Sequence, residues 1–123
     1  MPEEDEKKRR DVVLFLQELK ECIYGGPGLE IVNRQKNQEA LIELGLTKRN
    51  REEEILSLSV INYSSGPNED KDRPGTSVWI FGKKIDETEI YIKLKIYNVR
   101  GEDHAKCISF HKATSPLTCP FAE

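Results

Sequence analysis

Two lysines and a histidine lie among aromatic residues in the second half of the chain, and together they could bind and cleave RNA. Lys93 and Lys95 alternate with Tyr91, and His111 lies at the end of a later apolar run. Lysines neutralise phosphate, aromatic rings stack on bases, and a histidine can move a proton to or from a ribose 2′-hydroxyl near neutral pH. These residue types suit RNA chemistry if the fold brings them to one surface.

Strands must position these side chains. The runs at residues 77 to 85, 89 to 99 and 105 to 112 are rich in Val, Ile, Phe, Tyr and Trp, and short turns separate them. Such runs predict strands, and three consecutive strands joined by short turns predict an antiparallel meander.

Alternation along the middle strand separates two kinds of side chain. The even-numbered positions from 90 to 96 are all aliphatic. Tyr91, Lys93 and Lys95 project from the opposite face, because successive side chains of a strand alternate. The aliphatic face must pack on the helices, so we expect the tyrosine and the lysines on an open face of the sheet.

The two flanking strands extend this open face. In the last strand, Ile108 and Phe110 are expected in the core, which leaves Cys107, Ser109 and His111 on the open face if the pairing is antiparallel and in register. In the first strand, Val and Ile at positions 78 and 80 are expected in the core, with positions 79 and 81 on the open face. The open face would therefore display Trp79, Tyr91, Lys93, Lys95, Ser109 and His111.

The first half of the chain supplies helices to cover the aliphatic face. From apolar spacing and capping residues, helices are expected at residues 11 to 24, 37 to 45 and 47 to 58. The other expected elements are a short strand at residues 29 to 33, a loop at residues 62 to 75 and a surface tail pinned by Phe121. The sequence thus predicts one α+β domain over residues 1 to 123, frayed at residues 1 to 10, with its helices packed on one face of an antiparallel sheet.

Length and charge limit the classes of protein. A chain of 123 residues with 37% hydrophobic and 33% charged residues fits one soluble domain, and no apolar stretch is long enough for a membrane helix. The acidic start differs from a signal peptide, so we expect a cytosolic protein with no membrane partner. Net charge is −5 over residues 1 to 70 and +2 over residues 71 to 123, which places an anionic ligand on the second half.

Neither a metal nor another cofactor is expected. The three cysteines lie far apart in the sequence, which argues against a disulfide framework and does not match metal-site spacing. The sequence also offers no credible cluster of carboxylates or of cysteine and histidine to hold a metal ion.

Ordinary explanations compete with the RNA hypothesis. A solvated sheet face often contains lysine and tyrosine for solubility and cross-strand pairing, and His111 could equally be a surface histidine at a strand end. A second function class is a non-catalytic module whose sheet face docks a protein partner. An enzyme would gather its site residues in one concave patch, whereas a binding module would present a flat or apolar surface there.

Five short motifs follow one another over residues 37 to 121. They are Ala40-Leu41-Ile42-Glu43-Leu44-Gly45-Leu46-Thr47, Tyr63-Ser64-Ser65-Gly66-Pro67, Val78-Trp79-Ile80-Phe81-Gly82-Lys83, Ile90-Tyr91-Ile92-Lys93-Leu94-Lys95-Ile96 and Cys107-Ile108-Ser109-Phe110-His111. Their order resembles the MqsR-like branch of bacterial toxins in toxin–antitoxin systems. This resemblance implies a RelE-like α+β fold and a metal-independent endoribonuclease that cleaves messenger RNA and is inhibited by a cognate antitoxin.

The resemblance also implies residue roles. The family's central-strand tyrosine and lysine fall on Tyr91 and Lys93, and a basic residue of its last strand falls near His111. RNA would be cleaved by transphosphorylation, in which His111 or Tyr91 moves protons while Lys93, with Lys95 and Lys83, stabilises charge on the phosphorane oxygens. The expected partners are RNA and the antitoxin, with the ribosome as a further candidate.

Overall fold

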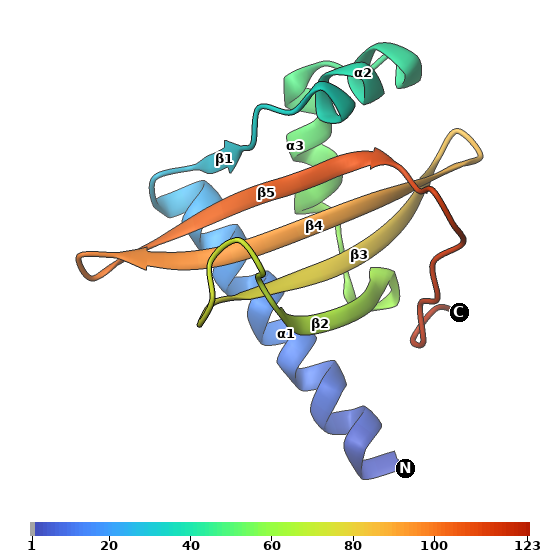
Figure 1. Cartoon of the computed structure of the whole chain (residues 1–123). Helices are drawn as coiled ribbons and strands as arrows, with labels where there is room; N and C mark the ends of the chain where they lie inside the picture. The colour runs from blue at the N-terminus through green and yellow to red at the C-terminus, as the bar shows by residue number, and fades with distance from the viewer. Residues whose placement is uncertain (1) are drawn as a thin grey trace.

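The structure is a computed structural model that describes residues 2 to 123, and it confirms the predicted α+β class (Figure 1). The helices are α1 (Pro2–Gly25), α2 (Gln35–Leu44), α3 (Lys48–Leu56) and the short 3₁₀ helix η1 (Val60–Asn62). The strands are β1 (Leu29–Ile31), β2 (Tyr63–Glu69), β3 (Ser77–Ile85), β4 (Thr88–Val99) and β5 (Glu102–Lys112). Within residues 2 to 123, no helix combines the length and apolar character needed to cross a membrane.

The strands form one sheet in the order β1-β5-β4-β3-β2. β3, β4 and β5 make the predicted antiparallel meander, and β2 joins it antiparallel to β3. The short β1 pairs with β5 in parallel, so the sheet is mixed. This order places β4 and β5, which contain the predicted catalytic residues Tyr91, Lys93 and His111, inside the sheet with a neighbouring strand on each side.

Helix α1 crosses the aliphatic face of the sheet (Figure 1). Val12 and Leu19 of α1 are fully buried, and so are Ile90, Ile92 and Leu94 of β4. The prediction that the aliphatic side chains of β4 face the helices is therefore confirmed. The helix begins at Pro2, so the segment expected as a frayed start is helical from position 2 onward.

The prediction of a loop over residues 62 to 75 is wrong for residues 63 to 69, which form β2. The pairing of β2 with β3 shifts register twice, and the strand contains glycine and proline, so it lacks the alternation that predicts a strand. Gly66 has φ of 130°, and a Cβ there would lie 3.0 Å from both the Trp79 Cα and the Val78 carbonyl oxygen. Only glycine fits this close approach without strain.

The prediction of which β3 side chains face the helices is also wrong. Trp79 and Phe81 face the helices, whereas Val78 and Ile80 lie on the open face. Phe81 is paired with Ile92 of the core, and directly paired positions of antiparallel strands share a face. The side chains on both faces of β3 are apolar, so the hydrophobic pattern could not show which face packs on the helices.

A bulge in β5 changes one further expectation. Lys93 pairs with Ser109 and Leu94 pairs with Cys107, which leaves Ile108 as an extra residue in β5. A bulge reverses the alternation on one side of the inserted residue. Cys107 is therefore buried in the core rather than displayed on the open face, whereas Ser109 keeps its predicted face.

The buried side chain of Asn37 in α2 accompanies this bulge. Its amide nitrogen donates to the Ile108 carbonyl at 3.0 Å, and its amide oxygen accepts from the Phe110 backbone N–H at 3.0 Å. These bonds satisfy backbone groups of β5 that the irregular ladder would leave unpaired.

The C-terminal tail is pinned by Phe121, as predicted. Phe121 is 7% exposed, and its ring stacks on Tyr63 with centroids 5.8 Å apart. The Arg9 guanidinium lies 4.6 Å from the centre of the same ring. Before reaching Phe121, the tail passes Gly82, where an added Cβ would lie 2.9 Å from Leu117.

Candidate functional site

The three predicted catalytic residues lie together on the open face of the sheet. Tyr91 of β4 pairs with His111 of β5, and Lys93 pairs with Ser109 one step along the same face. The rings of Tyr91 and His111 stack with centroids 5.5 Å apart and an angle of 20° between their planes. We call Tyr91, Lys93 and His111 the open-face cluster.

A hollow of about 560 Å³ opens over part of the open-face cluster. Ile80, Tyr91 and Lys93 line it from the sheet, residues 64, 65 and 68 to 72 line it from β2 and the following loop, and Leu117 lines it from the tail. The backbone N–H of Leu117 is held by a hydrogen bond to Glu89 Oε1 at 2.8 Å. A cation and an aromatic ring in one concavity can contact both the phosphate and the base of a nucleotide.

The hydrogen bonding of His111 fixes which ring nitrogen is available. Nδ1 lies 3.0 Å from the backbone carbonyl oxygen of Lys112. A carbonyl oxygen only accepts hydrogen bonds, so Nδ1 holds the proton in this contact and Nε2 of the neutral ring retains its lone pair. This is the form of histidine that can act as a general base.

Tyr91 and Lys93 supply a donor and a positive charge beside that base. Burial raises the pKa of the Tyr91 hydroxyl above its ordinary value, so the phenol stays protonated at neutral pH and can donate a hydrogen bond. Lys93 is half-buried and forms no ion pair within the described chain. Its ammonium group is held in no ion pair and can contact an anion, and its charge also helps to lower the pKa of the nearby Asp70 carboxylate.

The structure corrects the predicted role of Lys95. This side chain is 4% exposed, and its Nζ lies 2.7 Å from Asp70 Oδ2 and 2.7 Å from Thr76 Oγ1. Asp70 and Thr76 belong to the loop between β2 and β3, which covers Lys95. Lys95 thus anchors that loop and has no exposed ammonium group for RNA.

Trp79 and Lys83 are also corrected, because both lie on the helix face of the sheet. Trp79 stacks on Phe15 of α1 with ring centroids 4.7 Å apart. Lys83 forms an ion pair with Glu54 of α3, with Nζ 2.9 Å from Oε2. Neither side chain can contact an RNA nucleotide bound at the open-face cluster. Ser109 keeps the predicted face but is only 3% exposed, so it lies beneath the surface.

The chain was compared with known protein families, with curated proteins and with solved structures. No match was found. The functional argument therefore rests on the geometry of the open-face cluster and its surroundings.

Further charged residues, none of them predicted from the sequence, border the open-face cluster. Lys71 lines the 560 Å³ hollow together with Glu69, Asp70 and Asp72. A second hollow of about 390 Å³ beside His111 is lined by Lys36, Lys112, Glu39 and Glu43. These residues come from segments distant in sequence, so no local pattern links them to Lys93. Among residues 2 to 123, no three His, Cys, Asp or Glu side chains gather where they could hold a metal ion.

The ion pair of Asp70 with Lys95 predicts a loss of stability in acid. The Lys95 hydrogen bond, assisted by the Asp72 backbone N–H, outweighs burial and holds the pKa of Asp70 below its ordinary value of 3.8. A carboxylate with a lowered pKa stabilises the fold fully above its unfolded pKa, and this contribution is lost as pH falls through the folded pKa.

We therefore expect Asp70 to contribute a constant amount to the free energy of unfolding from pH 7 to pH 5, and to contribute less below about pH 4. Urea unfolding of the parent and of Asp70→Asn at pH 7, 5 and 3 measures this contribution. The difference between the two proteins should shrink at pH 3. An equal difference at all three pH values would contradict the assignment.

Proposed function

We propose that this protein is an endoribonuclease that cleaves messenger RNA by metal-independent transphosphorylation. The observation that supports this proposal best is the contact of Nδ1 of His111 with a carbonyl oxygen, which leaves Nε2 able to take a proton. Lys93 lies one step along the same face, beside an aromatic ring in a hollow. A base, a cation and a stacking surface are the groups that this reaction needs.

Each group has a definite role in the proposed reaction. His111 Nε2 accepts the proton of the ribose 2′-hydroxyl, and the 2′-oxygen forms a bond to the adjacent phosphorus. The bond from phosphorus to the 5′-oxygen then breaks, and that oxygen takes a proton from Tyr91 or from water. Lys93 neutralises the negative charge that builds up on the non-bridging oxygens. The products are a 2′,3′-cyclic phosphate and a 5′-hydroxyl.

A cytosolic ribonuclease of this kind needs an inhibitor, and we propose a cognate antitoxin protein as that partner. Neutralisation requires that the antitoxin cover or distort the open-face cluster. The loop of residues 70 to 76 is a suitable point of control, because it lies over the open face and is anchored there through Lys95. The ribosome is a further candidate partner, as the carrier of messenger RNA.

The products of the reaction test the proposal directly. Purified protein should cut a single-stranded RNA in the presence of EDTA, and the 3′ ends should resist a phosphatase until acid opens the cyclic phosphate. A DNA of the same sequence is the matched control, because it lacks the attacking 2′-hydroxyl. Cleavage of the DNA, or 5′-phosphate products from the RNA, would contradict the mechanism.

The competing candidate is a non-catalytic module whose open face docks a protein. The apolar residues Val78, Ile80 and Leu117 line the 560 Å³ hollow, which favours this alternative. Intact RNA, harmless overexpression of the chain, and a protein partner protecting Tyr91 would together support it over the ribonuclease.

A further inference from the structure

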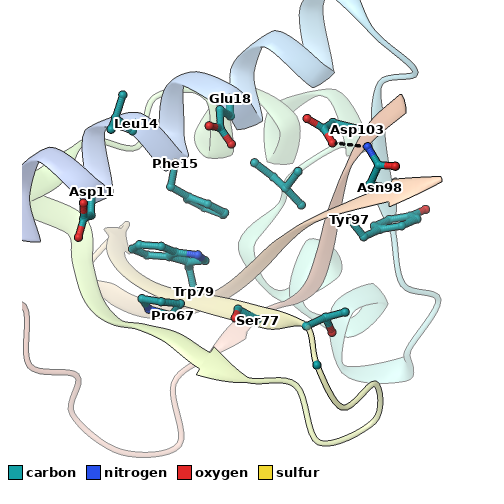
Figure 2. Close-up of a pocket in the computed structure, with 13 residues that line it drawn as sticks. Asp11, Leu14, Phe15, Glu18, Pro67, Ser77, Trp79, Tyr97, Asn98 and Asp103 are labelled. Atoms are coloured by element: carbon teal, nitrogen blue, oxygen red, sulfur yellow. Dashed lines mark hydrogen bonds between the residues drawn. The ribbon is translucent and has the colours of Figure 1, made fainter. Parts of the chain in front are cut away.

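A third cavity, larger than the two hollows described above, lies on the helix side of the sheet. It is a groove of about 660 Å³ between α1 and the ends of β3 and β4. Its apolar wall comprises Leu14, Phe15, Trp79 and Ile96, and Figure 2 shows the Phe15 ring lying over the Trp79 indole. Leu14 is 56% exposed at the edge of this wall. We call this cavity the Trp79 groove.

The rim of the Trp79 groove is negatively charged. Asp11 and Glu18 project from α1, and Asp103 projects from β5 (Figure 2). No lysine or arginine lines the groove, and none of these three carboxylates forms an ion pair with another residue between positions 2 and 123. The rim therefore repels phosphate and favours a cationic occupant.

The groove also presents a hydrogen-bond donor. The indole nitrogen of Trp79 is turned toward the middle of the groove (Figure 2). Because indole N–H is a donor only, it needs an acceptor such as a peptide carbonyl. An occupant that supplied a carbonyl, an apolar side chain and positive charges would match every kind of group around the groove.

We propose that the Trp79 groove binds a short basic peptide segment of a partner protein, with one or two apolar side chains between lysines or arginines. The apolar side chains contact Leu14 and the aromatic wall, and the basic side chains contact the three carboxylates. The volume exceeds what one apolar side chain fills, so flanking residues of the segment also enter the groove. This surface lies across the sheet from the open-face cluster and does not depend on the proposed ribonuclease activity.

Trp79 is the single tryptophan of the chain, so its fluorescence reports on the groove. The probe is a six-residue peptide with a Leu-Phe centre and two Lys or Arg residues on each side, free of Trp and Tyr. We expect a saturable change in Trp79 emission that weakens as salt is raised. The same peptide with glutamates in place of the basic residues should give no change.

Variants on α1 separate charge from apolar contact. The double variant Asp11→Asn with Glu18→Gln should weaken binding of the basic peptide by about threefold to tenfold. Leu14→Ser should weaken it without changing the charge. Glu21→Gln removes one charge of the same sign from an exposed position of α1 that does not line the groove, and it should bind like the parent.

Three outcomes would overturn the proposal. One is no saturable change with the basic peptide, and another is equal weakening by Glu21→Gln and by the double variant Asp11→Asn with Glu18→Gln. The third is an equal response to spermidine alone, which would identify a small polycation as the occupant instead of a peptide segment.

Discussion

Replacing His111 with alanine is expected to lower the rate of RNA cleavage by at least about a hundredfold, because removal of a general base or acid costs about 10² to 10⁴ in rate. Lys93→Ala should have a similar effect, since a charge contact made in the transition state is worth about 10² to 10³. Tyr91→Phe keeps the ring that stacks on His111 and removes only the hydroxyl. Its loss of rate therefore measures the contribution of the phenol. Cleavage rates of a defined RNA under single-turnover conditions give all three values.

Controls distinguish chemistry from folding. The three substitutions lie on the open face, so thermal unfolding should be nearly unchanged. Ile92→Ala, in contrast, empties a fully buried position and should cost about 2 to 4 kcal/mol of unfolding free energy. Lys48→Ala removes an exposed lysine from the start of α3 and should cleave RNA like the parent. Parental activity in the His111, Lys93 and Tyr91 variants would show that the site lies elsewhere.

Loss of Asp70 is expected to cause the largest fall in stability among the loop residues, about 3 kcal/mol for Asp70→Ala. The substitution leaves the ammonium group of Lys95 buried with Thr76 as its remaining side-chain partner. A buried charge without a counter-ion is far more costly than a missing ion pair. Urea unfolding at neutral pH measures the change in free energy.

The double variant Asp70→Ala with Lys95→Met tests the same explanation from the other side. It removes both charges, so its stability should lie much closer to that of the parent than that of Asp70→Ala does. The double-mutant cycle then gives a coupling energy for the pair. If Asp70→Ala unfolds like the parent, Lys95 is not held as described and remains a candidate for contact with RNA.

Local patterns in the sequence predict most of the helices and strands, and they predict which face of β4 is buried. Four aliphatic residues alternate there with tyrosine and lysine, so only one face can be buried without desolvating charge, and burying an unpaired ammonium group is costly. Antiparallel pairing then follows from the short turns and aligns Tyr91 with His111. For these reasons the open-face cluster could be predicted.

The face of β3 that packs on the helices could not be predicted from the sequence. Val78 and Ile80 are as apolar as Trp79 and Phe81, so burying either pair removes hydrocarbon from water. In the folded protein Trp79 and Phe81 face the helices, and Trp79 stacks on Phe15 of α1. The inserted residue Ile108 likewise has no local signal, because a bulge depends on the partner strand.

Lys95 shows the same limit most clearly. Like Lys93, which lies two positions before it in β4, it is a lysine on the open face of the strand. Only Lys95 lies beneath the loop that brings Asp70 and Thr76 within hydrogen-bond distance, 25 and 19 residues away in sequence. Whether a lysine on this face is a buried anchor or an available cation is therefore set by long-range contacts, which alternation along one strand does not encode.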